Sequence, residues 1–387
     1  MKTVLIISYS PLHTDPRIIR QIQALKQDYK IATIGYTQIK DNFIIYYPVK
    51  KPDKNSFIKK LFNFLSFLFN YKFYESRSLE RNLDIKNVLA KNIITPDVII
   101  ANDWNGLYLA SELKRYNNWS VKIYYDAHEY SPNDNISIIW RLFFRPVVVN
   151  TLKKCKKDID IMSTVCDGIA REYEKFFKFP EGFVRIITNA TEYNNNLKPT
   201  KIGGGDIIRI IHHGGALKKR KLELMIKMME YLESNRYELT FMLVQSEPVY
   251  YNYLIKLSQK YKNIKFIEPV SFSEITKTLN NYDIGLFLLL PEIFNYKYAL
   301  PNKLFEYIQA RLAIAIGPSI EMVKIVERYN LGVYSEDFSP KSLAKSITKL
   351  MPAEIMEYKR NADKSAKELS AEENINMIKN IIKEIEK

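Results

Sequence analysis

The sequence contains few cysteines and few histidines. Its two cysteines, Cys155 and Cys166, cannot build a disulfide framework and need no oxidising compartment. Four histidines leave little material for a histidine-rich metal site. No run of about 18 uncharged apolar residues is present, so no membrane-spanning helix is expected. The N-terminal segment MKTVLIISYSPLH is typical of a buried strand rather than of a signal peptide, which predicts a cytoplasmic protein.

The rest of the composition is that of a globular protein. The 387 residues are 47% hydrophobic and 26% charged, which argues against a mainly disordered chain and suits two domains. Lysine and arginine number 58 against 43 aspartate and glutamate, a formal net charge of +15. This excess favours an anionic partner, such as a nucleotide phosphate or a lipid headgroup. Nucleic acid is not an expected partner, because no recognisable reading module accompanies the charge.

Short β-rich runs alternate with amphipathic stretches along most of the chain. This pattern predicts an α/β protein with parallel sheets covered on both faces. An Asn-rich segment at 193–200 and three glycines at 203–205 interrupt it and predict a linker. Two doubly wound halves would then face each other across a cleft. The expected strands are Thr3–Ser8, Ile31–Gly35, Val98–Ala101, Lys122–Asp126, Ile159–Val165, Arg185–Thr188, Ile207–His213, Leu239–Val244, Ile264–Ile267, Ile284–Leu290 and Ala313–Ile316, and the expected helices are Pro16–Gln27, Asn105–Arg115, Asp167–Phe177, Lys218–Leu232, Tyr250–Gln259, Pro301–Ala310 and Glu321–Arg328.

The linker sets the expected domain boundaries. An N-terminal Rossmann-like domain covers 1–195, and a C-terminal one covers 205–352. Residues 353–387 form a helical tail that should pack back toward the N-terminal domain. The tail carries apolar residues at helical spacing, which are Ile378, Ile381, Ile382 and Ile385.

Two segments of the second half could bind a nucleotide. Gly214 and Gly215 follow a strand and precede a cluster of lysines and arginine, so phosphate oxygens could approach backbone N–H groups while cations neutralise a diphosphate. The alternative is a turn before a solvated basic helix end. Glu306 falls in the first two turns of an expected helix at a strand–loop junction, where its carboxylate could accept hydrogen bonds from a ribose diol. The alternative is an amphipathic helix whose glutamate faces solvent.

The segment 301–310 closely resembles the donor-site helix of GT-B glycosyltransferases, in particular the retaining family 4, where a P-x-x-x-x-E stretch precedes a small strand. Four segments of the first half resemble that family in the same order. Segments 96–103 and 124–129 are similar to the strand ends of its acceptor side, 160–167 to its strand-to-helix turn, and 189–191 to the segment before its linker.

The resemblance implies a GT-B fold of two Rossmann-like domains and transfer of a sugar, with retention, from a nucleotide-diphosphate donor to an acceptor hydroxyl. It implies no metal and no other cofactor. A role in bacterial surface polysaccharide or lipid-linked glycan synthesis is expected by the same analogy. The catalytic residues it implies are His128, Arg220 and Lys221; the donor-binding residues are Gly214, Gly215, Lys219, Asn302, Lys303, Glu306 and Val270; the acceptor-side residues are Asp15, Arg17, Asp103 and Asp126.

Departures from the family pattern leave alternatives open. Ala216 stands where the family has an arginine, and Tyr298 stands where it has a first glutamate. The N-terminal Gly-Gly loop is replaced by 10–17, where Asp15 and Arg17 serve either the acceptor or the helix start. His128 could be a structural residue at a strand end. The alternatives to an active transferase are a catalytically silent GT-B partner subunit and a nucleotide-sugar 2-epimerase, although Tyr298 and the few histidines count against the epimerase.

An aromatic segment could bring the protein to a membrane surface. In 57–74, apolar residues fall on one helical face with lysines at both ends, as in helices that lie at a bilayer interface. A buried helix over the first sheet is the alternative. The segment 138–145 has the same mix of apolar and basic residues.

Overall fold

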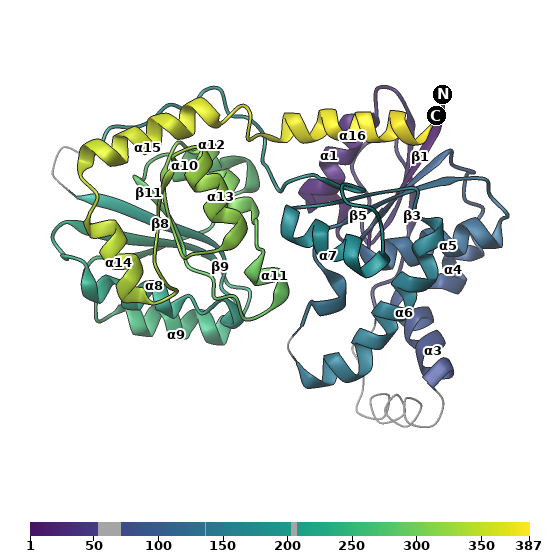
Figure 1. Cartoon of the computed structure of the whole chain (residues 1–387), viewed down its shortest axis with the longest axis horizontal. Coiled ribbons are helices and arrows are strands. Elements are labelled where there is room, and N and C mark those ends of the chain that lie inside the picture. Colours follow the sequence, from purple (N-terminus) through teal and green to yellow (C-terminus); the bar gives the residue numbers. More distant parts are fainter. Residues whose placement is uncertain (53–70, 136, 203–206) are drawn as a thin grey trace. The chain divides into compact units, whose positions relative to one another are not determined.

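The computed structural model describes residues 1–52, 71–135, 137–202 and 207–387, and the chain divides into two compact units (Figure 1). Unit 1 comprises Met1–Ile187 and Ile375–Lys387, and unit 2 comprises Thr188–Asn374. The change of unit thus comes a few residues before the Asn-rich segment from which a linker was predicted. The three glycines of that linker and residues 57–70 of the aromatic segment lie outside the described residues.

Unit 1 contains a sheet of parallel strands in the order β3-β2-β1-β4-β5-β6-β7. From β1 to β3 successive strands are added on one side of β1, and from β4 onward they are added on its other side. Open α/β sheets bind ligands at such a switch point, beyond the C-termini of their strands. Its strands are β1 (Thr3–Ile7), β2 (Lys30–Gly35), β3 (Ile45–Pro48), β4 (Val98–Asn102), β5 (Lys122–Ala127), β6 (Ile161–Thr164) and β7 (Val184–Ile186).

Helices cover this sheet and bury its apolar side chains. One face packs Val4 and Ile100 of the sheet against Ile18 and Ile22 of α1 and against α16. Figure 1 shows α16 beside α1 with the two chain ends together, and Lys2 Nζ lies 3.6 Å from the Glu386 carboxylate. The tail isoleucines in this core are Ile378, Ile381, Ile382 and Ile385. The helices are α1 (Pro16–Leu25), α3 (Tyr71–Leu83), α4 (Ile85–Leu89), α5 (Asp103–Tyr116), α6 (Arg145–Cys155), α7 (Asp167–Phe177) and α16 (Ala371–Ile385).

Unit 2 repeats the architecture with a parallel sheet in the order β10-β9-β8-β11-β12-β13. Its switch point, where successive strands are added on the other side, lies between β8 and β11. Helices α8, α9 and α14 contribute to its main apolar core. The strands are β8 (Ile208–Gly215), β9 (Tyr237–Val244), β10 (Ile264–Ile267), β11 (Ile284–Phe287), β12 (Ala313–Ile316) and β13 (Gly332–Tyr334); the helices are α8 (Glu223–Met228), α9 (Pro248–Ser258), α10 (Ile275–Leu279), α11 (Phe294–Lys297), α12 (Asn302–Gln309), α13 (Ile320–Arg328), α14 (Pro340–Thr348) and α15 (Pro352–Ser365).

The structure differs from the sequence predictions in several elements, and helices α6, α10 and α14 are among those that were not predicted. The predicted helix 218–232 is broken, because Lys221 adopts a left-handed backbone (φ 50°) between a short turn, Lys218–Arg220, and α8. The strands β3 and β13 were not predicted, since both are short strands at sheet edges without a continuous buried run. In the part of the chain that the structure describes, every helix is too short or too polar to span a bilayer.

Candidate functional site

Gly214 and Gly215, at the C-terminal end of β8, form a glycine loop at the switch point of the unit 2 sheet. Gly214 has a φ of 120°, a backbone conformation that side chains of L-residues rarely allow. A Cβ at Gly215 would come within 2.8 Å of the Ser246 hydroxyl oxygen. Gly214 therefore requires glycine, whereas a side chain at Gly215 would require the Ser246 hydroxyl group to move.

Two cations converge on this loop. A Cβ built on Gly214 would lie 3.2 Å from Lys303 Nζ and 3.8 Å from a terminal nitrogen of Arg220. Lys303 is 7% exposed, and its Nζ lies 4.4 Å from the centre of the Phe287 ring. Burial and the nearby Arg220 lower the pKa of Lys303 below its ordinary value. In the described part of unit 2, neither cation forms an ion pair, so an anion at the loop would relieve their mutual repulsion.

Lys303 stands at the start of α12, next to Asn302. No side chain caps this helix end, so its first backbone N–H groups add partial positive charge to the same region. Glu306, one turn further along α12, is 5% exposed, and burial raises the pKa of its carboxyl group. The structure thus brings together Gly214, Arg220, Lys303 and Glu306, as the sequence predicted for a nucleotide-diphosphate site.

His213 is a member of this cluster that the sequence analysis did not assign. Its Nε2 lies 3.2 Å from Glu306 Oε2, although not in the direction of a hydrogen bond. Burial, together with the charge of Lys303, lowers the pKa of His213 to about 3, so the imidazole is neutral. Its position directly before the glycine pair was the available signal. Neighbouring His212 donates a hydrogen bond from Nδ1 to the Leu286 carbonyl oxygen at 2.9 Å, which links β8 to β11.

Three other predicted residues, of which Lys221 was assigned as catalytic and Lys219 and Val270 as donor-binding, make their described contacts elsewhere. The Lys221 ammonium group pairs with Glu292, and the Lys219 Nζ lies 5.9 Å from the centre of the Tyr296 ring. Val270 follows β10 at the edge of the sheet and is 37% exposed. Of the two adjacent residues assigned as catalytic, the structure therefore places Arg220 rather than Lys221 against the glycine loop.

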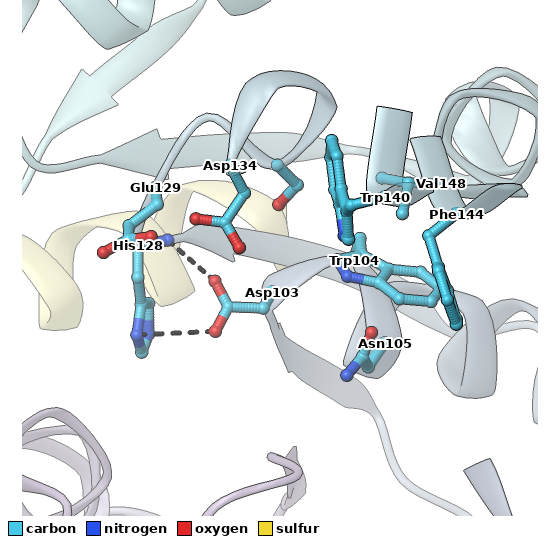
Figure 2. Close-up of a pocket in the computed structure, with 10 residues that line it drawn as sticks. Asp103, Trp104, Asn105, His128, Glu129, Asp134, Trp140, Phe144 and Val148 are labelled. Atoms are coloured by element: carbon cyan, nitrogen blue, oxygen red, sulfur yellow. Dashed lines mark hydrogen bonds and ion pairs between the residues drawn. The ribbon is translucent and has the colours of Figure 1, made fainter. Parts of the chain in front are cut away.

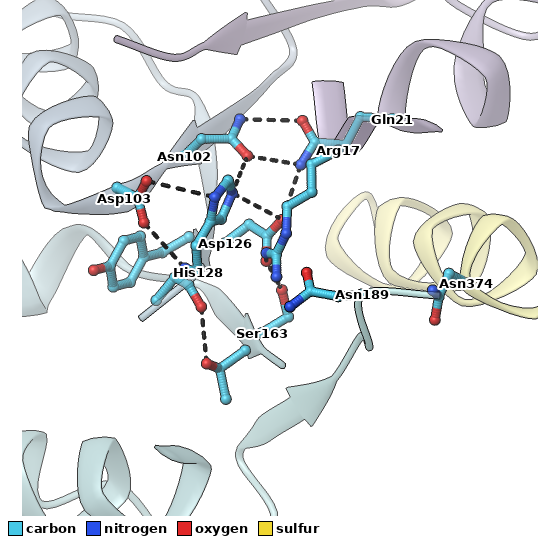
Figure 3. Close-up of polar contacts among 12 residues, drawn as sticks. Arg17, Gln21, Asn102, Asp103, Asp126, His128, Ser163, Asn189 and Asn374 are labelled. Atoms are coloured by element: carbon cyan, nitrogen blue, oxygen red, sulfur yellow. Dashed lines mark hydrogen bonds and ion pairs between the residues drawn. The ribbon is translucent and has the colours of Figure 1, made fainter. Parts of the chain in front are cut away.

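In unit 1, a buried polar network occupies the C-terminal ends of β4, β5 and β6 (Figure 3). Asp126 accepts hydrogen bonds from Arg17 at 3.2 Å, from Gln21 at 3.0 Å and from Ser163 at 2.6 Å. The Arg17 and Asp126 side chains are only 8% and 3% exposed. These two predicted acceptor-side residues are thus placed to orient their neighbours. Asp15 caps α1 by accepting the Arg17 backbone N–H at 3.1 Å.

The same network determines which ring nitrogen of His128 carries the proton. The Asn102 amide nitrogen faces the Ile7 carbonyl oxygen at 3.2 Å, and a carbonyl can only accept. The Asn102 Oδ1 atom therefore faces Gln21 and, at 3.3 Å, His128 Nε2. His128 must donate from Nε2, which leaves its Nδ1 as an acceptor. Burial and the charges of Arg17 and Arg20 lower the pKa of His128 well below its usual range, so the ring is neutral.

Asp103 lies against the Nδ1 side of His128. One carboxylate oxygen accepts the His128 backbone N–H at 3.0 Å, and the other lies 3.6 Å from Nδ1. Asp103 also has a left-handed backbone (φ 57°), which is uncommon outside glycine. The carboxylate is crowded by protein atoms although 40% of its side-chain surface is exposed, and this burial raises its pKa from 3.8 to about 7. The Asp103 carboxyl group therefore titrates near neutral pH beside a neutral imidazole ring.

No protein-family model matches the chain, and a search of curated proteins found no significant match. Solved structures match it over its whole length. Sucrose-phosphate synthase from Thermosynechococcus elongatus has a TM-score of 0.74 at 11% identity and covers 100% of this chain and 99% of its own. The α,α-trehalose 6-phosphate synthase from Burkholderia multivorans has a TM-score of 0.68 at 10% identity, and the match covers 100% of this chain and 98% of that one. Anabaena HepE in complex with UDP has a TM-score of 0.68 at 10% identity, and the match covers 99% of this chain and 100% of that one.

The chain has the GT-B fold. The predicted α/β architecture of two doubly wound sheets is confirmed, whereas the assignment to family 4 stays a prediction. In GT-B terms, the glycine loop with Arg220, Lys303 and Glu306 belongs to the C-terminal sheet, and the His128 network belongs to the N-terminal sheet. Within the described residues, no group of three or more His, Cys, Asp or Glu side chains is placed to hold a metal ion.

Proposed function

We propose that this protein is a glycosyltransferase that moves a sugar from a nucleoside-diphosphate sugar to an acceptor hydroxyl. The observation that carries the proposal is the convergence of Arg220 and Lys303 on Gly214 without an ion-pair partner among the described residues. A diphosphate supplies the negative charge that this arrangement lacks. The GT-B fold gives support by analogy, and Anabaena HepE, which shares the fold, is in complex with UDP.

On this proposal, the residues of unit 2 stabilise the leaving group. Arg220, Lys303 and the uncapped start of α12 surround the diphosphate and stabilise the charge that develops on it as the bond to the sugar breaks. Glu306, held beside neutral His213, accepts hydrogen bonds from the ribose hydroxyls. The acceptor hydroxyl attacks the anomeric carbon from the face that the diphosphate leaves, its proton passes to a phosphate oxygen, and configuration is retained. No metal is required, because cationic side chains meet the charge.

Unit 1 would then hold the acceptor, with His128 and Asp103 at its site. Synthesis of a bacterial surface polysaccharide or a lipid-linked glycan is the setting that we propose. An exposed apolar strip supports contact with a lipid surface: Ile138, Ile139 and Leu142 are 74%, 68% and 56% exposed, and Arg141 lies among them. Such a strip next to a cation suits the interface of an anionic bilayer.

The chain offers a matched test of the diphosphate site, because Arg220 and Lys221 are adjacent and only one faces Gly214. We expect Arg220→Gln to weaken UDP binding by about tenfold to a hundredfold, as loss of a hydrogen bond to a charged group predicts. Lys221→Gln removes the same charge one position away and should change the affinity by less than about threefold. Isothermal titration calorimetry with UDP measures both. Equal losses in the two variants, or no UDP binding by the wild type, would contradict the assignment.

Turnover separates an active enzyme from a silent subunit. Tyr298 occupies the position of the family's first glutamate and packs against Phe294 with ring centres 4.9 Å apart, which is the observation that favours a silent subunit. Incubation with a panel of UDP- and GDP-sugars without acceptor should release free nucleoside diphosphate from one donor, and Glu306→Ala should abolish the release. UDP binding without hydrolysis of any donor would point to the silent subunit.

A further inference from the structure

A pocket in unit 1 lies beside the His128 network and is not used by the donor chemistry. Its volume is about 320 Å³, at the lower end of the usual range for small-molecule sites. Its wall combines residues from the start of α5, the segment after β5 and the turn before α6 (Figure 2). The lining residues that matter here are Asp103, Trp104, Asn105, Glu129, Asp134 and Trp140.

One side of the pocket is aromatic. Trp104 and Trp140 are two of the three tryptophans in the chain, and Figure 2 shows them gathered with Phe144 on one side of the pocket. Tryptophan offers a broad, flat apolar face together with a polar N–H group. Such a face fits the C–H surface of a pyranose ring, whereas a phosphate or an extended acyl chain would leave it poorly matched.

The opposite side of the pocket is acidic. Figure 2 shows Asp103, Glu129 and Asp134 away from the tryptophans, and no lysine or arginine is among the lining residues. In a protein with a net charge of +15, this local excess of carboxylates is a specific feature of the pocket. Carboxylates accept strong hydrogen bonds from hydroxyl groups and repel an acidic ligand. The chemistry therefore selects a polyhydroxylated ligand without a negative charge.

Three further observations on the backbone and polar groups of this wall are typical of a functional site. Asp103 holds a left-handed backbone, a conformation that in a residue other than glycine stores strain and that concentrates at functional sites. The Asn105 Oδ1 atom is buried with no hydrogen-bond partner among the described residues. In addition, Trp140 and Phe144 bound a π-helical turn, a form of backbone often found at functional sites.

We propose that this pocket binds a sugar ring of the acceptor, with the ring against Trp104 and Trp140 and its hydroxyls on Asp103, Glu129 and Asp134. The bound sugar carries no acidic group. This inference rests on the proposed glycosyltransferase function and deepens it, because it names the acceptor as a glycan and gives the residues that recognise it.

Methyl glycosides provide the probe. We expect methyl glucoside, galactoside, mannoside or glucosaminide to bind with a dissociation constant in the millimolar range, measured by saturation-transfer NMR and tryptophan fluorescence, and methyl glucuronide to bind at least about tenfold more weakly. Trp140→Leu and Trp104→Leu should each weaken binding by about tenfold or more. Trp119→Phe is the matched control, because Trp119 lies outside the pocket and should leave binding unchanged.

The outcomes distinguish this inference from the proposed function. Asp134→Asn keeps the side-chain volume and removes one charge, so it tests the acidic side even if a tryptophan variant fails to fold; it should bring the glucuronide closer to the glucoside in affinity. Calorimetry with UDP is run on every variant and should give the wild-type affinity. UDP binding without saturable binding of any glycoside would overturn the pocket assignment alone, as would equal affinity for glucuronide and glucoside. Loss of UDP binding in the wild type would overturn the proposed function.

Discussion

His213 Nε2 lies 3.2 Å from Glu306 Oε2, which joins the end of β8 to the second turn of α12. The contact is between a neutral imidazole, whose pKa burial lowers to about 3, and a carboxyl group whose pKa burial raises. The imidazole therefore lies against Glu306 without neutralising it. Lys303, one turn before Glu306, remains directed at the glycine loop. On the proposed function, the two side chains of α12 have separate tasks, with Glu306 binding a ribose and Lys303 a diphosphate.

Gly214 tests whether the glycine loop is a ligand site. Gly214→Ala places a methyl group 3.2 Å from Lys303 Nζ, so we expect UDP affinity to fall by about tenfold or more while the far-UV circular dichroism spectrum stays unchanged. Gly182→Ala is the control, because Gly182 also has a positive φ of 79° but has nothing within 4 Å of an added Cβ. It should cost about 1 kcal/mol of stability and leave UDP binding intact. Equal UDP affinity in both variants would contradict the assignment.

The affinity for UDP should fall as the pH rises above neutrality. Burial and Arg220 hold the pKa of Lys303 below its ordinary value of 10.5, and a bound diphosphate would raise it again. Binding therefore takes up a proton in the range where free Lys303 is partly neutral, and affinity is lost as the pH passes upward through that range.

Calorimetry in buffers of different ionisation enthalpy measures this proton uptake, at pH values above about 7, where the UDP phosphate itself is mostly ionised. Lys303→Met should bind UDP more weakly and should lose most of the pH dependence. A wild-type affinity that stays constant from about pH 7 to pH 9 would rule out Lys303 as a titrating ligand of the diphosphate.

Asp103→Asn should stabilise unit 1 at alkaline pH. Burial raises the pKa of Asp103 from 3.8 to about 7, so the folded protein binds more protons than the unfolded chain between these values. The stability that this group contributes is complete below about pH 4 and is lost as the pH rises through about 7. Asparagine tolerates the left-handed backbone and can still accept the His128 N–H bond, but it has no charge to bury.

Thermal unfolding of both proteins across pH 4 to 8 tests this expectation. The melting temperature of the variant should exceed that of the wild type at about pH 8, and the difference should shrink toward about pH 4. A constant difference over the whole range would show that Asp103 does not titrate in this way, and a variant that is less stable at pH 8 would contradict it directly.

Much of the site in unit 2 could be predicted because its residues stand at local landmarks. Gly214 and Gly215 end a strand, and Lys303 and Glu306 begin a helix, so a local pattern carries their positions. The choice between Arg220 and Lys221 could not be predicted, because the left-handed backbone at Lys221 turns adjacent side chains in different directions. The contact of His213 with Glu306 depends on the crossing of β8 and α12, which no local pattern encodes.

The sequence by itself determined the alternation of strands and helices, and with it the two doubly wound sheets of a GT-B protein, because the burial of a parallel strand and of a helix face is written in short-range apolar periodicity. Tertiary structure alone decided which polar groups meet. Arg17 and Asp126 are far apart in the chain but form a buried pair, and Trp104 and Trp140 reach one pocket from different elements. The physical reason is that a hydrogen bond or a pocket wall depends on distances of a few ångströms between side chains, and only the packing of the elements sets those distances.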